Sequence, residues 1–544
     1  MTPPGAGRAD TSSLGRVGGK FGERRRRFDG HGLVARRPAA GLPHRRTILD
    51  MGDDTGSRVG ALPDHPFTLG VASGDPTADG VVLWTRLAPE PLLPQGGLPF
   101  RTFAVDWQVA TDEAFTDVVR TGTVGAHPEL AHSVHPEVTG LLPDRAYFYR
   151  FRVGPHVSAT GRTRTFPRPG TPVRSLRLAT LSCQNLVAGR FAALRHLAGQ
   201  GHDVVLHVGD YVYEARGPAE PVAGADRRHH PFRDATTLED YRMRHAQYRL
   251  DADLRAAHAA APFLCVPDDH DVVGRMAGPL GRNGRDDPAL FRRRLAAAYR
   301  AYYEHLPLRR TALPRGPGMQ LYRRFEYGDL ASISLLDTRQ HRSPQVDGPP
   351  FQPNGPEALD PARTMTGPAQ ERWLLDGLAS SAGRWNLVGQ QVYLAALDLG
   401  AGEEPVFNTD KWDGYPAARA RLTGFLAEAR PRNPVFLAGD SHAAMVSDIT
   451  HGCVPAGPVV ATELLGSSVS SAKGNTATFE AALPKNPQVR YYNGRQRGYL
   501  SCTVTPEQLR GDLWFVENVL DAGSPVRLGA SWAVQDGVLG AQPA

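Results

Sequence analysis

Short apolar runs that lead directly into acidic, histidine or cysteine side chains recur along the chain after residue 175. Residues 204–208 form one such run, and Gly209 and Asp210 follow it. An apolar, β-branched run of this length is typical of a buried strand. The same pattern occurs at 176–181, 263–266 and 434–438, which lead into Cys183, the acidic stretch 268–271, and Asp440 with His442. Because ligands of α/β proteins bind at the carboxyl ends of strands, we predict that these four ends lie in one sheet and form a functional site.

The segments between and after these strands alternate between helical and extended patterns. Thr236 followed by Glu239 fits a capping box that opens a helix. His245 stands among the apolar positions of that helix, so we interpret it as a packing residue rather than a ligand. Further helices are predicted at 288–305, 371–379 and 417–429, and further strands at 330–336, 385–392, 459–463 and 499–504. Strands that alternate with helices indicate an α/β domain.

Residues 66–168 show a different pattern, with short alternating runs separated by turns and no helical period. The run 147–153 places its aromatic and aliphatic side chains on one face. Leu142 approaching Tyr147 resembles the tyrosine corner of immunoglobulin-like sandwiches. The stretch 167–170 contains two prolines and a glycine and is interpreted as a linker. The region carries few catalytic groups, so we expect an all-β structural or positioning module.

The positive charge of the chain is concentrated at its beginning. Residues 1–50 hold eleven Lys and Arg against four acidic residues, a balance of +7 within a total of +6, so the remaining residues carry −1. A basic tail on a near-neutral fold excludes nucleic acid as a stable partner. Arg24–Arg27 resemble the start of a twin-arginine export signal, but no apolar stretch follows them. We therefore expect residues 1–62 to form a disordered basic tail, and no run of the chain is apolar enough to span a membrane.

The four cysteines are Cys183, Cys265, Cys453 and Cys502, and none of them forms a Cys-x-x-Cys pair. A zinc knuckle or a thioredoxin-type site therefore has no support. Cys265 lies in an apolar strand and is interpreted as a core residue. A bridge between Cys453 and Cys502 stays open.

Several motifs in series carry a family resemblance. They are Cys183, Gly-Asp-Tyr-Val-Tyr at 209–213, Asp-Asp-His-Asp at 268–271, Leu-Asp-Thr-Arg at 336–339, Asn-Thr-Asp-Lys-Trp-Asp-Gly-Tyr at 408–415 and Gly-Asp-Ser-His at 439–442. In this order, and over residues 66–510, the chain resembles the alkaline phosphatase D family. The resemblance implies an α/β fold, namely a calcineurin-like four-layer αββα metallophosphoesterase core preceded by an immunoglobulin/fibronectin-like β-sandwich domain. With it we divide the chain into a β-sandwich domain at 63–168, a catalytic domain at 171–520 and a C-terminal tail at 521–544.

The resemblance also implies an iron(III)–calcium centre that hydrolyses phosphomonoesters and phosphodiesters, in a monomeric protein located outside the cytoplasm. Carboxylates suit calcium and iron, and a thiolate and a phenolate suit a ferric ion. We assign Asp210 as the bridging carboxylate, with Cys183 and Tyr213 toward iron. The remaining metal positions go to Asp269, Asp440 and His442, without a choice of metal for each.

The other site residues are assigned less specifically. His270 either donates a proton to the leaving group or holds its loop. Asn185, Asn408 and Trp412 are the candidate substrate-binding residues, although a surface-loop interpretation of the last two stays open. Arg339 is interpreted as a structural ion-pair residue rather than a phosphate clamp.

Two positions depart from the family pattern, which has Trp before Asp-Asp-His and Glu after it. Here Pro267 and Asp271 stand there. Pro267 would end its strand, where a missing N–H is tolerated. Asp271 is one methylene shorter, so its hydrogen bonds must shift. Neither change removes a proposed ligand.

Three rival functions were weighed against a phosphatase. A serine hydrolase requires Gly-x-Ser-x-Gly, and Ser441 lacks the final glycine. A phospholipase D-type phosphodiesterase is possible on the same fold, because no pocket motif separates a lipid ester from a soluble one. A non-catalytic binding protein with a vestigial site is the third alternative, and retention of six ligand-type residues argues against it.

Overall fold

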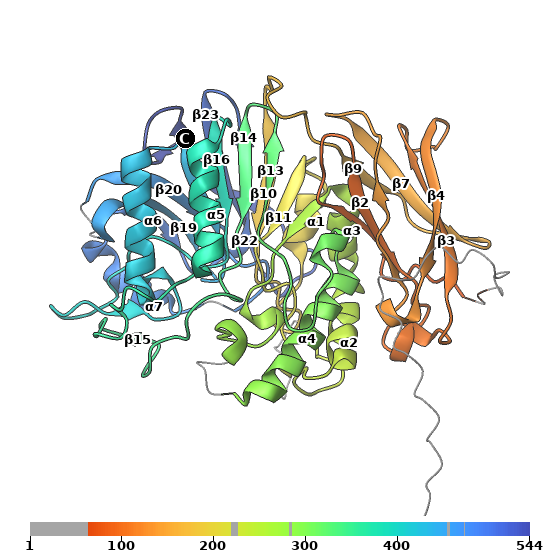
Figure 1. Ribbon diagram of the computed structural model, residues 1–544, viewed down its shortest axis with the longest axis horizontal. Helices are drawn as coiled ribbons and strands as arrows, with labels where there is room; N and C mark the ends of the chain where they lie inside the picture. Colours follow the sequence, from red (N-terminus) through yellow and green to blue (C-terminus); the bar gives the residue numbers. More distant parts are fainter. Residues whose placement is uncertain (1–61, 63, 219–226, 282–285, 454–456, 473) are drawn as a thin grey trace, which may run out of the picture. The chain divides into compact units, whose positions relative to one another are not determined.

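The structure is a computed structural model, and it describes residues 62, 64–218, 227–281, 286–453, 457–472 and 474–544 (Figure 1). The predicted basic tail therefore lies outside the described residues, apart from Leu62. The chain divides into two units, Met1–Asp54 and Thr55–Ala544. Everything that follows concerns the second unit.

An eleven-stranded mixed sheet contains three of the four strands that were predicted to lead into the site. Its order is β25-β24-β23-β22-β10-β11-β12-β1-β2-β5, with β6 paired to β2. The bounds are β1 Val71–Gly74, β2 Val81–Arg86, β5 Ser133–Val134, β6 Glu137–Val138, β10 Leu176–Leu181, β11 Val204–His207, β12 Phe263–Cys265, β22 Arg497–Val504, β23 Gln508–Val516, β24 Val526–Gln535 and β25 Gln542–Pro543. β10, β11 and β12 are parallel neighbours, so their carboxyl ends lie at one edge.

A seven-stranded mixed sheet contains the fourth strand. Its order is β13-β14-β16-β18-β20-β19-β21. The bounds are β13 Arg323–Tyr327, β14 Ala331–Leu335, β16 Trp385–Gly389, β18 Pro434–Ala438, β19 Ala444–Thr450, β20 Val459–Leu465 and β21 Val489–Asn493. The prediction that all four strand ends belong to one sheet was therefore wrong, because β18 pairs with β16 and β20. A local sequence pattern shows that a strand is buried but not which strand it pairs with.

The two sheets stack on each other, and helices cover their outer faces (Figure 1). Leu206, Ile333 and Leu387 belong to the apolar cluster between the sheets. Val205, which points to the opposite face of β11, belongs to a cluster with the helices α1–α4. Both faces of the central strands are thus buried, which explains their continuous apolar runs.

The helices lie close to their predicted positions. Their bounds are α1 Ala192–Ala198, α2 Leu238–Arg249, α3 Ala252–Ala260, α4 Pro288–His305, α5 Gly367–Ser380, α6 Pro416–Ala429 and α7 Thr476–Ala482. The predicted capping box is one residue further along, at Thr237 with Asp240. α5 and α6 pack against the seven-stranded sheet. None of the described helices is both long and apolar enough to cross a bilayer.

The N-terminal β region packs two sheets face to face and shares one of them with the rest of the chain. A five-stranded sheet is formed by β3 Phe103–Ala110, β4 Val118–Ala126, β7 Ala146–Val153, β8 His156–Val157 and β9 Gly161–Arg164. Its buried face meets β1 and β2 in one apolar cluster. Because β1 also pairs with β12, the region is not a detached module. The hydroxyl of Tyr147 accepts the main-chain N–H of Leu142 at 2.9 Å, as a tyrosine corner requires.

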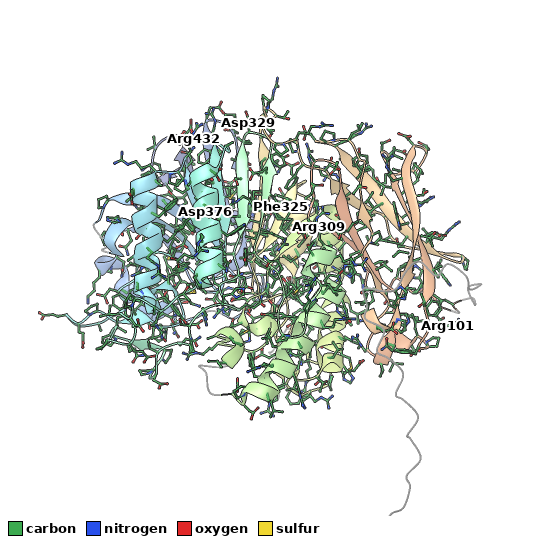
Figure 2. All side chains as sticks on the ribbon, viewed as in Figure 1. Arg101, Arg309, Phe325, Asp329, Asp376 and Arg432 are labelled. Carbon is green, nitrogen blue, oxygen red and sulfur yellow. The ribbon has the colours of Figure 1, made fainter. Side chains whose placement is uncertain are left out.

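Polar contacts also join this region to the core. The guanidinium of Arg309 lies 3.0 Å from a carboxylate oxygen of Glu137 and donates to the main-chain oxygen of Asp75 at 2.6 Å (Figure 2). The guanidinium of Arg323 lies 2.8 Å from the buried carboxylate of Asp75. These contacts hold the end of β1 beside the strand ends of the site.

Two further expectations are corrected by the structure. Residues 521–544 are not a tail, because β24 pairs with β23 over most of its length and β25 pairs with β24. The period of β24 is hard to recognise, since its exposed edge positions are Arg527, Leu528 and Gly529. The open bridge to Cys502 does not form, because Cys502 is a free, buried thiol of β22.

His245 packs in the core as predicted, and its burial leads to an acid-stability prediction. It stacks on His305 at 5.0 Å, and neither of its ring nitrogens has a hydrogen-bond partner in the described part of the chain. Burial and the neighbouring guanidinium groups lower the pKa of His245 to about 3. Its folded-state pKa is therefore below its unfolded value of about 6.5, so the folded protein loses stability as the pH falls below 6.5.

We expect His245→Phe to reduce this acid sensitivity. Phenylalanine retains the ring stack but binds no proton. The slope of the free energy of unfolding between pH 6.5 and about 4 should fall by up to about 1.4 kcal/mol per pH unit. Urea unfolding at a series of pH values measures it, with the exposed His65→Phe as control. An unchanged slope in His245→Phe would contradict this account.

Candidate metal centre

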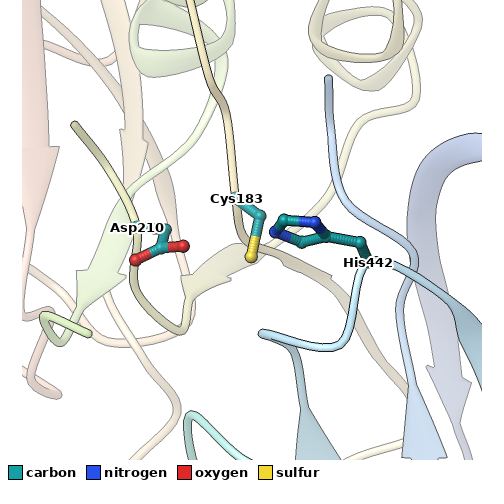
Figure 3. A group of neighbouring side chains, drawn as sticks. All are labelled: Cys183, Asp210 and His442. Carbon is teal, nitrogen blue, oxygen red and sulfur yellow. The ribbon is translucent and has the colours of Figure 1, made fainter. Parts of the chain in front are cut away.

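The strand ends bring the predicted ligand-type side chains together. Ligand atoms of Cys183, Asp210 and His442 lie within 4.8 Å of one another, and the thiol lies between the carboxylate and the imidazole (Figure 3). Asp210 also groups with Asp269 and His270 at the same spacing, and the structure places Asp269 in a third group with Asp268 and Asp440. The hydroxyl of Tyr213 lies 2.7 Å from Asp210 Oδ2 and 3.2 Å from His442 Nε2. All six predicted ligand positions thus form one continuous cluster.

The backbone at these positions adopts a conformation that residues other than glycine rarely use. φ is +59° at Cys183, +53° at Asp210, +62° at Asp440 and +53° at His442. Left-handed φ values at such residues cost on the order of 1–3 kcal/mol each and persist where the surroundings enforce them. Each strand therefore turns sharply at its end, which directs four ligand-type side chains toward one point.

Gly209 permits two strand ends to approach each other. Its φ is +110°, and a Cβ atom there would lie 2.6 Å from the main-chain nitrogen of Asp268. Only glycine combines this φ with so close a neighbour. The Gly-Asp pair that follows β11 is therefore required by the packing of β11 against the end of β12.

The cluster strongly disfavours anions unless a cation is present. Burial, followed by the charges of Asp268 and Asp269, raises the pKa of Asp210 to about 7, although nearby His270 opposes the shift. Burial and the charge of Asp210 raise the pKa of the Cys183 thiol and of the Tyr213 phenol well above their usual values. A bound cation would supply the compensating charge and favour the thiolate and phenolate forms.

His442 is prepared for a different role. Burial lowers the pKa of its imidazole to about 3, so the ring is neutral. Its Nδ1 lies 2.8 Å from the main-chain oxygen of Ala472, which orients the ring with Nε2 toward Tyr213. A neutral, oriented imidazole is the form that binds metals.

Arg339 occupies the centre of the third group. Its buried guanidinium donates to Asp268 and Asp410, and its Nη2 lies 3.2 Å from Asp440 Oδ1 and 3.3 Å from Asp269 Oδ1. The structure therefore agrees with the interpretation of Arg339 as an ion-pair residue. Because its partners come from the ends of β12 and β18 and from the loop at Asp410, Arg339 links the two stacked sheets.

Unused oxygen atoms show that this group can hold a cation. Oδ2 of Asp268 is buried and has no hydrogen-bond partner among the described residues. Oδ1 of Asp269 and Oδ2 of Asp440 also accept no hydrogen bond in this part of the chain, although cationic side chains lie close to both. Buried carboxylate oxygens without hydrogen bonds are costly unless a cation binds them, and oxygen ligands fit a hard cation such as calcium.

The predicted substrate-binding residues are placed differently from one another. Asn185 is half-buried beside the Cys183 turn, and its side-chain oxygen accepts the N–H of Val187. Asn408 lies on β17, Phe407–Asn408, which pairs only with β15, Phe351–Gln352. Trp412 is buried in the apolar cluster beneath α6 and donates to Gln390 at 2.8 Å, so it does not line a pocket mouth. The 3₁₀ helix η7, Trp412–Gly414, turns its indole inward.

Four neighbouring residues were missed by sequence reasoning. Lys411, beside Trp412, directs its ammonium group at Asp440, and Asp410 pairs with Arg339. The hydroxyl of Ser471 donates to Tyr213 at 2.7 Å, and Asp268 stands beside the predicted Asp269. Asp268, Asp410 and Lys411 lie within motifs that had been singled out, whereas Ser471 carries no sequence signal.

The two departures from the family pattern are accommodated. Oδ2 of Asp271 accepts the main-chain N–H of Asp268 at 2.9 Å, and Oδ1 accepts that of Val212 at 3.1 Å. The shorter carboxylate therefore still joins the loop after β12 to the loop after β11. Pro267 directly follows β12 and carries no ligand-type group.

The fold and the cluster together define an α/β protein with a candidate multinuclear metal centre. The description "PhoD-like phosphatase" matches residues 178–513, and "PhoD-like phosphatase, N-terminal domain" matches residues 55–167. The chain therefore belongs to the PhoD-like phosphatase family, as the motifs predicted, and this is a family of phosphoric ester hydrolases.

Two relatives illustrate how far the similarity extends. The chain is 44% identical over 486 residues to alkaline phosphatase D of Bacillus subtilis (strain 168), which covers 88% of this chain and 82% of the relative. A solved structure described as the structure of PhoD superposes with a TM-score of 0.85 at 42% identity, covering 89% of this chain and 93% of that chain.

Proposed function

We propose that the protein is an alkaline phosphatase and phosphodiesterase that hydrolyses phosphoric esters at an iron–calcium centre. The observation that carries this proposal is the convergence of thiol, phenol, imidazole and carboxylate groups in one buried cluster. Family membership supports hydrolysis of phosphate esters as the reaction class.

The donor atoms divide the cluster into two halves. Cys183, Tyr213 and His442 provide sulfur, phenol oxygen and nitrogen, which fit iron(III). Asp269 and Asp440, joined by Asp268, provide only oxygen, which fits calcium. Asp210 belongs to groups on both sides and would bridge the two ions.

The chemistry follows from these positions. A bound pair of metal ions supplies charge neutralisation for the phosphoryl oxygens and a hydroxide at neutral pH. Asp210 and Tyr213 hold the ligand cluster rigid through their mutual hydrogen bond. Arg339 and Lys411 add positive charge beside Asp440, where negative charge of the substrate would otherwise be repelled by the carboxylates.

We further assign the fold to the calcineurin-like four-layer αββα type with an immunoglobulin-like β-sandwich before it. Two stacked sheets flanked by helices support the first assignment. The tyrosine corner and the packing of β3 and β7 against β1 and β2 support the second. A crystal structure of the chain tests both.

Hydrolysis assays test the proposed function. The purified protein should hydrolyse p-nitrophenyl phosphate and bis-p-nitrophenyl phosphate, lose activity in a calcium chelator and regain it when calcium is returned. Phosphatidylcholine, assayed in parallel, tests the phospholipase D alternative. Metal-loaded protein that hydrolyses none of the three esters would support a non-catalytic binding protein instead.

A further inference from the structure

Glu214 is a buried carboxylate beside the cluster, and none of the assignments above uses it. It directly follows Tyr213 and is 5% exposed. Its Oε2 lies 2.8 Å from Nδ1 of His270, and its Oε1 accepts the main-chain N–H of Gly274 at 2.8 Å. Both oxygens thus hold the loop that follows β12. A carboxylate is costly to bury, so two directed hydrogen bonds to one loop indicate a specific role.

The imidazole of His270 is held by other contacts as well. Its ring stacks on that of Tyr213 with 4.4 Å between the centroids. A Cβ atom at Gly274 would lie 2.8 Å from Cε1 of His270, so the backbone closes one side of the ring. The main-chain N–H of His270 donates to Asp210 Oδ1 at 3.2 Å. The ring therefore has one orientation, fixed beside the carboxylate predicted to bridge the metals.

One ring nitrogen of His270 stays available. Nδ1 is used by Glu214, and within the described residues Nε2 makes no hydrogen bond. The side chain is 32% exposed, whereas that of Glu214 is 7% exposed. A ring nitrogen lies within 4.8 Å of carboxylate oxygens of Asp210 and Asp269. The imidazole is thus buried on the Glu214 side and open on the other.

We propose that Glu214 is a positioning residue that holds His270 so that Nε2–H donates a proton to the leaving-group oxygen of the bound ester. The inference rests on the proposed function and narrows its substrate class. It favours esters of alkyl alcohols, whose oxygen leaves only when it is protonated. Of the two roles left open for His270, it selects that of proton donor.

The step balances without a further reactant. The hydroxide oxygen bonds to phosphorus while the bond between phosphorus and the alcohol oxygen breaks. The electron pair of that bond stays on the alcohol oxygen, which takes the Nε2 proton of His270. The imidazole then regains a proton from the next water, so ester and water give alcohol and phosphate. Glu214 retains the Nδ1 proton throughout and so leaves Nε2 as the exchanging atom.

Two substrates with different leaving groups test the inference. p-Nitrophenolate leaves without a proton, whereas the glycerol of glycerol phosphate does not. Proton donation by a placed side chain contributes about 10²–10⁴-fold, so Glu214→Gln should lower kcat on glycerol phosphate at least about tenfold more than on p-nitrophenyl phosphate. Glu214→Asp, which keeps the carboxylate, should recover part of that difference.

Two further variants isolate the contact with His270. In a His270→Gln background, Glu214→Gln should cost nothing more on glycerol phosphate, because its effect passes through the imidazole. Glu463→Gln is the matched control, since Glu463 is also buried and accepts the main-chain N–H groups of Leu394 and Ala395. It should change both activities by the same factor.

The outcomes separate this inference from the proposed function. An equal loss on both esters, loss of metal from Glu214→Gln, or an additional loss in the double variant would overturn the positioning role. Wild-type protein that hydrolyses neither ester would overturn the proposed function itself.

Discussion

Asp210→Asn should abolish hydrolysis while the protein stays folded. Asp210 is the one residue whose oxygens belong both to the group with Cys183 and His442 and to the group with Asp269. An amide retains the shape but not the charge, so it can no longer neutralise two cations. We expect kcat/KM on p-nitrophenyl phosphate to fall at least about 10³-fold, or ~4 kcal/mol of transition-state stabilisation. Bound metal should fall in parallel.

A surface carboxylate provides the control for this substitution. Asp106 lies on β3, and its side chain is 44% exposed in an ion pair with Arg152. Asp106→Asn should leave kcat/KM within about twofold, because surface substitutions have small effects. If Asp210→Asn retained parental activity and metal in a clean preparation, the assignment of the active site would be wrong.

Gly209→Ala should reduce activity strongly although it removes no ligand. An alanine at φ +110° is strained, and its Cβ would lie 2.6 Å from the main-chain nitrogen of Asp268. The loop after β12 must then move, and it carries Asp268, Asp269 and His270. A displacement of about 1 Å costs on the order of 10²-fold in rate, so we expect at least that loss of kcat/KM. The melting temperature should also fall.

Gly154→Ala separates the collision from the backbone strain. Gly154 has φ +55°, but a Cβ there meets nothing within 4 Å. It should cost some stability, since alanine disfavours positive φ, and leave kcat/KM unchanged. Equal kinetics in the two alanine variants would show that the approach of Gly209 to Asp268 does not shape the site.

The strand ends could be predicted because the signal is local. A strand buried on both faces needs a continuous apolar run, and the polar residue that ends it is visible in the sequence, as at Val208 and Asp210. For the same reason β10, β18 and α4 lie where the pattern placed them. The partners of β18 could not be predicted, because pairing depends on residues far away in the chain.

Residues that reach the site from loops were the ones missed or misplaced. Trp412 and Lys411 are neighbours, and only the turn of η7 decides that the indole enters the core while the ammonium group reaches Asp440. Ser471 reaches Tyr213 from a loop after β20 that has no distinctive composition. Glu214 stood inside the leading motif, but its partner His270 is 56 residues away. Such contacts exist only in the folded chain.

Elemental analysis combined with visible absorption, on active protein purified without added metal, tests the central claim most directly. The account predicts iron and calcium together, with a visible charge-transfer band from Cys183 and Tyr213. Active protein that contains only zinc, or no metal, and has no visible band would contradict it.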